Sequence, residues 1–136
     1  MASLAGTILC VDDDEDDLLF LRDVILDINP ALNVVELKNG MEAISYLHEA
    51  TINDSLPCLT LLDINMPFMD GKRTLEKIRS EKALEHLSVV VLTNSQNPND
   101  KAYFNKLGVE MHTKPLNLSA LNTMVRQFLS DHCVQF

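Results

Sequence analysis

Five residues whose side chains could act together in chemistry stand at the ends of short apolar segments. They supply three carboxylates, one hydroxyl and one ammonium group: Asp12, Asp13, Asp63, Thr93 and Lys114. Three carboxylates brought close together repel one another, so they either retain a proton or recruit a cation. Hard oxygen ligands favour Mg²⁺ or Ca²⁺ over softer metals. These residue types therefore indicate a site for a hard divalent cation.

The same residues suggest a reaction. A carboxylate beside a bound cation can act as a nucleophile toward phosphorus, because the metal offsets the charge of the transferring group and holds it in line. The ammonium of Lys114 could neutralise one further negative charge. Phosphoryl transfer onto an aspartate is the predicted chemistry, provided that the fold brings these side chains together.

Alternation of two patterns along the chain predicts that fold. Short apolar segments alternate five times with longer segments of helical period, which is typical of an α/β domain. The predicted strands are Thr7–Asp12, Asn33–Leu37, Cys58–Asp63, Ser88–Thr93 and Val109–Thr113. The first, third and fourth are almost continuously apolar, as expected for parallel strands that are covered on both faces.

Capping and turn residues predict a helix after each strand. The first helix covers 16–28, with Asp14 as its N-cap and with Glu15, Asp16 and Asp17 complementing the helix dipole in its first turn. The other helices are expected to begin after Asn39, at Gly71, at Asn97-Pro98 and after Asn117. In the last helix, apolar residues at helical spacing predict a stripe that packs on the sheet: Leu118, Leu121, Val125 and Phe128.

Such alternation with right-handed crossovers gives a doubly wound parallel sheet, on which ligands gather beyond the carboxyl ends of the strands. Asp12, Asp13, Asp63, Thr93 and Lys114 each end or follow a predicted strand. We therefore expect all five at one edge of the sheet.

Length and composition predict a single domain over 1–136, with a core at about 7–129. The chain has 20 acidic and 11 basic residues, and the net charge of −9 disfavours binding to nucleic acid or to anionic membranes. No apolar segment approaches the roughly 20 residues of a membrane span, and we expect a cytoplasmic protein.

The three cysteines are an odd number without CxxC spacing, which suggests neither a disulfide framework nor a zinc site. Cys10 and Cys58 lie in apolar segments. We expect both to be buried, reduced thiols that behave as small hydrophobic residues.

Four segments resemble the successive motifs of response-regulator receiver domains: ILCVDDDEDD, LLDINMPFMDG, VVVLTNS and MHTKP. They occur in the family's order with its approximate spacing, and the resemblance extends from Thr7 to Leu129. Four ordered motifs are specific, whereas a single DD or KP dipeptide is not. The resemblance implies a flavodoxin-like sheet of five parallel strands in the order 2-1-3-4-5 with five helices.

By this resemblance Asp63 is the phosphoacceptor and also contacts Mg²⁺, which Asp13 binds directly and Asp12 through water. Asn65 contributes its backbone carbonyl to the metal. The resemblance also implies that Lys114 is followed by a cis peptide bond to Pro115, an uncommon isomer.

Phosphate binding and switching form a second group of implied roles. Thr93, Asn94 and Lys114 are expected to meet the phosphoryl group, and movement of Thr93 is expected to repack the face made by the fourth helix, fifth strand and fifth helix. Met111 stands where the family commonly has an aromatic switch residue. Methionine is flexible, which leaves two alternatives: it fills the vacated space, or coupling is weaker or uses another element.

The resemblance also implies partners. A sensor histidine kinase or phosphotransfer protein would donate the phosphoryl group from a phosphohistidine, and the domain would then hydrolyse its own phosphate slowly without any other enzymatic activity. Only residues 131–136 follow the last predicted helix. We therefore expect no output domain, with the output in a partner protein or in homodimer formation.

Two other functions compete with this interpretation. A phosphohydrolase with an aspartate nucleophile would need a second carboxylate two residues after Asp63 as general acid or base, but Asn65 occupies that position. An adaptor that is never phosphorylated would not need the five side chains at the strand ends, all of which are present.

Overall fold

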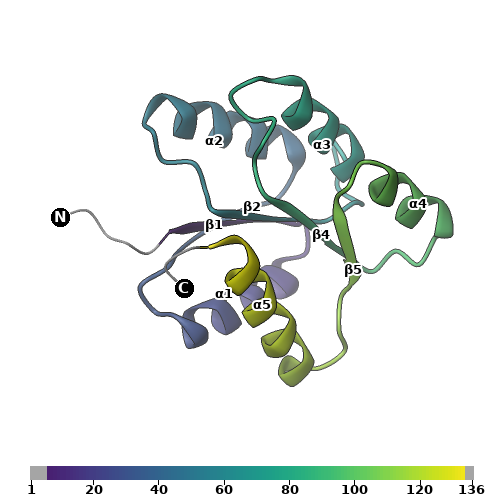
Figure 1. Ribbon diagram of the computed structural model, residues 1–136. Helices are drawn as coiled ribbons and strands as arrows, with labels where there is room; N and C mark the ends of the chain where they lie inside the picture. The colour runs from purple at the N-terminus through teal and green to yellow at the C-terminus, as the bar shows by residue number, and fades with distance from the viewer. Residues whose placement is uncertain (1–5, 134–136) are drawn as a thin grey trace.

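Strands and helices alternate along the chain in the computed structural model, which describes residues 6–133 (Figure 1). The strands are β1 (Thr7–Val11), β2 (Asn33–Leu37), β3 (Leu59–Leu62), β4 (Val89–Thr93) and β5 (Glu110–Thr113). The helices are α1 (Glu15–Ile28), α2 (Gly40–Ile52), α3 (Gly71–Ser80), α4 (Pro98–Lys106) and α5 (Leu118–His132). All ten predicted elements are present, with ends that differ by one or a few residues.

The five strands form one parallel sheet in the order β2-β1-β3-β4-β5. This confirms the predicted doubly wound fold and its strand order. Val11 of β1 pairs with Leu62 of β3, so the residues that follow them leave the sheet side by side. Thr93 of β4 pairs with Thr113 of β5 in the same way. The register therefore sets all four strand ends at one edge.

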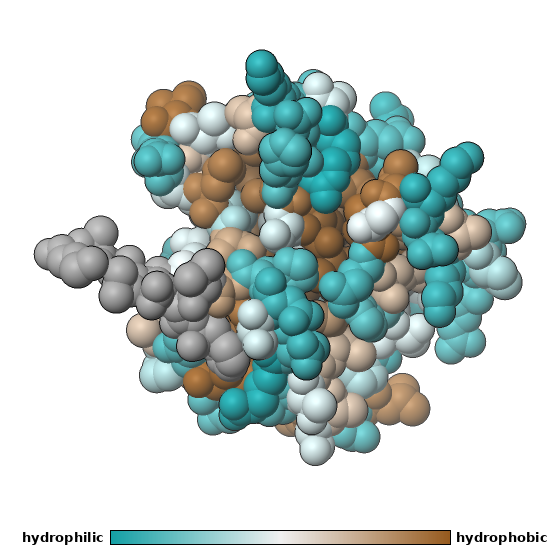
Figure 2. All heavy atoms as spheres, in the orientation of Figure 1, coloured by the Kyte–Doolittle hydropathy of each residue, from teal (hydrophilic) through white to brown (hydrophobic). Residues whose placement is uncertain are grey.

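Helices cover both faces of the sheet: α1 and α5 lie on one face, and α2 and α3 lie on the other with α4 beside them (Figure 1). Alternate residues of β1 divide between the two cores, because successive side chains of a strand point to opposite faces. Ile8 and Cys10 pack with α1 and α5, whereas Leu9 and Val11 pack with α2 and α3. Figure 2 shows mainly polar side chains over the outer surface, with apolar ones between the helices and at a few outer positions.

A polar side chain caps the N-terminus of every helix in the described part of the chain. Asp14 accepts hydrogen bonds from the backbone N–H groups of Asp16 and Asp17, as predicted. The remaining caps are Asn39, Asp70, Asn97 and Asn117. Each cap fixes where a loop from the carboxyl end of a strand turns into a helix, and so it shapes the edge at which the polar residues meet.

The stripe on α5 was predicted correctly except at its first position. Leu121, Val125 and Phe128 are buried, and Leu129 joins them. Leu118 is 55% exposed, because it is the first residue of the helix and directly follows the cap at Asn117.

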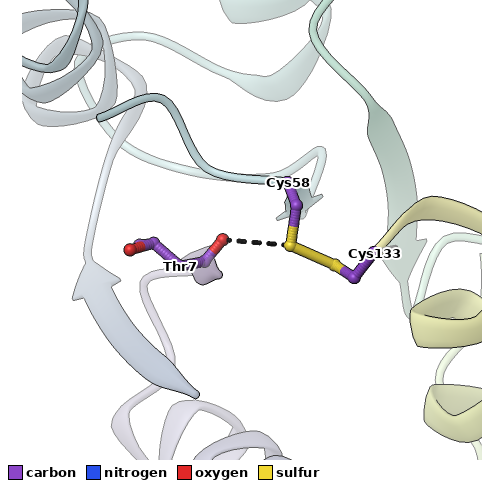
Figure 3. The surroundings of a disulfide bond; sticks show 3 residues. All are labelled: Thr7, Cys58 and Cys133. Carbon is purple, nitrogen blue, oxygen red and sulfur yellow. Dashed lines mark hydrogen bonds between the residues drawn. A yellow bond between two sulfur atoms is a disulfide. The ribbon is translucent and has the colours of Figure 1, made fainter. Parts of the chain in front are cut away.

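A disulfide joins Cys58 to Cys133, and the prediction that Cys58 is a reduced thiol was wrong (Figure 3). The two Cα atoms are 5.3 Å apart, a normal separation for a disulfide. Cys58 precedes β3 and Cys133 caps the end of α5, so packing of α5 on the sheet brings together residues that are 75 positions apart. Cys10 is free and buried, as predicted, and burial is the main cause that raises its pKa to about 12.

None of the helices within residues 6–133 is both long enough and apolar enough to cross a membrane.

The disulfide should stabilise the fold without affecting the polar edge, because it lies at the amino end of β3, opposite to Asp63. Since it links residues 75 positions apart, its reduction should lower the free energy of unfolding by about 2–4 kcal/mol. Urea denaturation with and without dithiothreitol measures this. A variant that carries both Cys58→Ala and Cys133→Ala should not respond to the reductant. Identical curves for the wild type under both conditions would show that the bond does not form in solution.

Gly71 should be intolerant of a side chain. A Cβ atom at this position would lie 2.3 Å from the backbone oxygen of Asp63 and 2.8 Å from the Cα atom of Ile64. Gly71→Ala should therefore displace the loop after Asp63 and lower the free energy of unfolding by about 1–3 kcal/mol. The exposed neighbour Arg73 offers a control, since Arg73→Ala should cost less than about 0.5 kcal/mol. Equal thermal stability of the two variants would contradict this steric account.

Candidate active site at the sheet edge

Backbone hydrogen bonds fix the positions of the candidate residues just beyond the strands. The N–H of Asp12 donates to the carbonyl of Leu37 (3.0 Å), and that of Asp63 donates to the carbonyl of Val11 (3.0 Å). The N–H of Lys114 donates to the carbonyl of Thr93 (2.8 Å). These bonds continue the parallel ladders by one residue, so the side chains start from well-defined points at the ends of β1, β3 and β5.

Three carboxylates meet at this edge, as the sequence predicted. Asp12, Asp13 and Asp63 each place one oxygen within 4.8 Å of the others. Asp12 and Asp63 are buried, whereas Asp13 is exposed. A cluster of oxygen donors that is open on one side suits a hard divalent cation that keeps part of its water shell. The residues present therefore fit a divalent metal.

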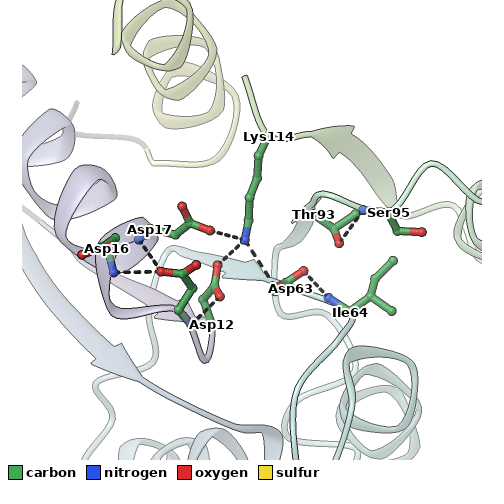
Figure 4. A network of polar contacts seen from close by, with 9 residues as sticks. Asp12, Asp16, Asp17, Asp63, Ile64, Thr93, Ser95 and Lys114 are labelled. Atoms are coloured by element: carbon green, nitrogen blue, oxygen red, sulfur yellow. Dashed lines mark hydrogen bonds and ion pairs between the residues drawn. The ribbon is translucent and has the colours of Figure 1, made fainter. Parts of the chain in front are cut away.

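Lys114 reaches into this acidic cluster (Figure 4). Its Nζ atom lies 2.6 Å from Oδ2 of Asp12, 2.7 Å from Oδ2 of Asp17 and 3.3 Å from Oδ2 of Asp63. The Lys114 side chain is only 11% exposed, so solvent screens these contacts weakly. The predicted meeting of Lys114 with the strand-end carboxylates is confirmed.

Asp17 is the member of this group that the sequence analysis missed. Its position in the first turn of α1 was interpreted only as an acid that complements the helix dipole. Glu15 and Asp16 carry the same pattern, and nothing in the local sequence distinguishes Asp17 from them. Its contact is with Lys114, 97 positions away, and only the packing of α1 beside the end of β5 reveals it.

The surroundings raise the pKa of both Asp12 and Lys114, which favours the neutral form of Asp12 and the charged form of Lys114. Burial is the main cause that raises the pKa of Asp12 from 3.8 to about 6; the charge of Asp63 adds to it, while hydrogen bonds from Lys114 and from the N–H of Asp14 act against it. Burial alone would lower the pKa of Lys114, but its hydrogen bonds to Asp12 and Asp17 outweigh burial and raise it. Lys114 is therefore firmly protonated, whereas Asp12 takes up a proton readily.

The carboxylate of Asp63 is held by both of its oxygens. Oδ1 accepts a hydrogen bond from the N–H of Ile64 (2.7 Å), and Oδ2 faces Lys114. The side chain is therefore oriented before any ligand arrives. Asn65, two residues later, is exposed in the loop that leads to α3, and its expected role as a metal ligand stays a prediction.

Thr93 and its neighbours border the site. Among the described residues, they make no direct hydrogen bond to Asp63. Thr93 is fully buried, and its hydroxyl accepts a hydrogen bond from the N–H of Ser95 (3.2 Å). Asn94 is exposed and lines a cavity of about 430 Å³ that Asp17 and Lys114 also border. Met111 is half-buried and packs against the core under α3 and α4. The switching roles of Thr93, Asn94 and Met111 stay predictions.

The Lys114-Pro115 peptide bond is trans, because the described residues contain no cis peptide bond. The prediction of a cis bond was therefore wrong for this structure. The trans isomer is the lower-energy form of most X-Pro bonds. In this isomer Lys114 already makes its backbone bond to Thr93 and its three carboxylate contacts.

Comparison with known proteins places the chain in a family. Residues 8–126 match the model of the response regulator receiver domain. The chain is 33% identical over 122 residues to response regulator Rcp1 of Synechocystis sp., a match that covers 88% of this chain and 83% of Rcp1. It is 31% identical over 113 residues to stress response regulator protein 1 of Debaryomyces hansenii, which covers 82% of this chain and 44% of that protein.

Solved structures agree with this placement. The phosphorylated cyanobacterial phytochrome response regulator RcpA superimposes with a TM-score of 0.84 at 30% identity, covering 97% of this chain and 96% of RcpA. The Mn²⁺-bound form of Rcp1 gives a TM-score of 0.80 at 29% identity and 96% coverage of both chains. Domains of this family interact with histidine kinases or phosphotransfer proteins. The chain belongs to the response regulator receiver domains, the phosphoryl-accepting modules of two-component phosphorelays.

Proposed function

We propose that Asp63 accepts a phosphoryl group from the phosphohistidine of a sensor kinase or phosphotransfer protein. One observation carries this assignment: Asp63 belongs to the three-carboxylate cluster and also faces the ammonium of Lys114 at 3.3 Å. A nucleophilic oxygen placed between a cation site and a fixed positive charge can approach a phosphoryl group, because both charges offset the negative charge of the transferring oxygens. The P–N bond to histidine breaks as the new O–P bond forms.

We propose Mg²⁺ as the metal, with Asp13 and Asp63 as direct ligands, Asp12 bound through water and Asn65 contributing its carbonyl oxygen. The Mn²⁺-bound form of Rcp1 supports a divalent ion in a relative of this chain. When bound, Mg²⁺ supplies charge compensation for the transferring group. The protein residues position the reacting groups. The N–H of Ile64 orients Asp63, and Lys114 is available to pair with a phosphoryl oxygen.

The proposed output is a change in the α4-β5-α5 face that a partner protein or a second copy of the chain recognises. Thr93 would leave its bond with Ser95 to meet the phosphoryl group, joined by Asn94. Ser95 donates to Asp100 of α4, and Asp100 also pairs with Lys72 of α3 at 2.6 Å. This chain of contacts offers a route from Thr93 to α4 that does not depend on Met111.

The proposed location is the cytoplasm, where sensor kinases obtain phosphate from ATP. Thiols there are largely reduced, and Cys58 and Cys133 would then be unpaired for much of the time. We expect slow hydrolysis of the phosphorylated Asp63 by the domain itself and no other enzymatic activity. Asn65 cannot act as a general acid or base, which disfavours a phosphohydrolase.

Phosphorylation by a small donor tests the assignment of Asp63. Incubation with Mg²⁺ and acetyl phosphate should add one phosphoryl group, as measured by intact-mass spectrometry. Asp63→Asn should abolish the gain, because an amide oxygen is a far weaker nucleophile than a carboxylate, whereas Asp23→Asn at an exposed site on α1 should not change it. A wild type that never gains the group would favour the non-phosphorylated adaptor. Turnover of phosphomonoesters would favour the phosphohydrolase.

Metal affinity should depend on pH through Asp12. The folded domain binds a proton at Asp12 with a pKa of about 6, so that below this pH Mg²⁺ must displace the proton. The affinity for Mg²⁺ should therefore be constant above about pH 7 and fall by up to about tenfold per unit below pH 6. Calorimetric titration at several pH values measures this. Asp12→Asn should bind Mg²⁺ more weakly, and its affinity should no longer change with pH in this range. If the pH dependence persists in this variant, a group other than Asp12 causes it.

A further inference from the structure

The ion pair between Asp17 and Lys114 differs from an ordinary surface contact. Asp17 lies in the first turn of α1, and its Oδ2 atom is 2.7 Å from Nζ of Lys114, which follows β5. The two side chains are 26% and 11% exposed. A short contact between partly buried groups that are 97 positions apart holds a defined geometry, unlike most exposed ion pairs.

The three carboxylates around Lys114 are not equivalent. Asp12 and Asp63 belong to the cluster that suits a divalent cation, and Asp17 does not. A cation at that cluster would compete with Lys114 for the negative charge of Asp12 and Asp63, and its own charge would repel the ammonium. Asp17 is the partner of Lys114 that remains available under these conditions.

Asp16 shows that the contact is not a general property of this helix turn. The backbone N–H groups of Asp16 and Asp17 both bind the cap at Asp14, and both carboxylates complement the same end of the helix dipole. Asp16 is exposed, however, and has no ion pair with Lys114 among the described contacts. The dipole therefore explains an acid at either position but not the contact made by Asp17.

We propose that Asp17 is a positioning residue for Lys114: it holds the ammonium beside Asp63 while a metal ion occupies the neighbouring carboxylates. This inference rests on the proposed function of Asp63. With Asp17 present, Lys114 can leave Asp12 and Asp63 to the metal and stay where it pairs with the incoming phosphoryl group. Without Asp17, the remaining carboxylate partners of Lys114 are metal ligands, and Lys114 competes with Mg²⁺ for them.

Matched variants separate this role from the helix dipole. Asp17→Ala and Asp16→Ala each remove one negative charge from the same turn. Asp17→Ala should raise the Kd for Mg²⁺ by fivefold or more in calorimetric titration, and should slow phosphorylation by acetyl phosphate at saturating Mg²⁺ by threefold or more. Asp16→Ala should change either quantity by less than twofold. Equal effects of the two variants would overturn the proposal.

A double-mutant cycle with Lys114 tests whether Asp17 acts through that residue. Lys114→Ala removes a competing cation and should tighten Mg²⁺ binding. In this background the further change Asp17→Ala should alter the Kd for Mg²⁺ by less than twofold. A fivefold effect that persists without Lys114 would mean that Asp17 acts on the metal by its charge alone, and the positioning role would be wrong.

The experiments distinguish a failure of the proposed function from a failure of the role assigned to Asp17. A wild-type domain that neither binds Mg²⁺ nor accepts phosphate from acetyl phosphate would overturn both proposals. A wild type that does both, with an Asp17→Ala variant that behaves like Asp16→Ala, would overturn only the role of Asp17.

Discussion

The repulsion between two buried carboxylates, Asp12 and Asp63, is the constraint on which the rest of the site depends. Their backbone N–H groups are bound into the strand ladders, so the points from which the two side chains start stay close together. Removal of such charges from water is costly unless an opposite charge compensates them. Lys114 provides that charge at 2.6 Å and 3.3 Å. One ammonium faces Asp12, Asp17 and Asp63, and Asp13 adds a further carboxylate beside them, so the compensation is incomplete and the edge retains an attraction for a further cation.

The rest of the fold keeps this arrangement rigid. Parallel strands with buried apolar side chains on both faces fix the register that sets β1 beside β3. Gly71 allows α3 to begin in contact with the backbone of Asp63, and the N–H of Gly71 binds the carbonyl of Ile64 at 2.7 Å. Covalent reinforcement by the disulfide is confined to the opposite edge. The reactive edge is therefore held by backbone contacts and caps, which leave its side chains free to exchange partners.

Sequence reasoning succeeded where a local pattern has one physical cause. An apolar segment that ends in an aspartate predicts a buried strand and a carboxylate at its carboxyl end, and Asp12 and Asp63 lie there. Contacts between distant segments were missed for the opposite reason. Asp17 carries the same first-turn pattern as Asp16, and Cys58 and Cys133 have no spacing that indicates a bond, so both pairings arise only from how α1 and α5 pack. The isomer of the Lys114-Pro115 bond is likewise not set by local sequence.

Lys114 also connects the chemistry to the proposed output. Its N–H is bound to the carbonyl of Thr93, so a shift of Lys114 toward a phosphoryl group and a shift of Thr93 toward the same group would move β4 and β5 together. Met111 sits in β5 opposite Val91 and packs into the core that α4 covers. In the proposed output the strand pair would transmit this shift through its backbone, and the flexible side chain of Met111 would follow it without a change between two distinct rotamers. We therefore propose that the hydrogen-bonded pair of strands, with the contact from Ser95 to Asp100, takes the place of the aromatic residue in coupling phosphorylation to α4.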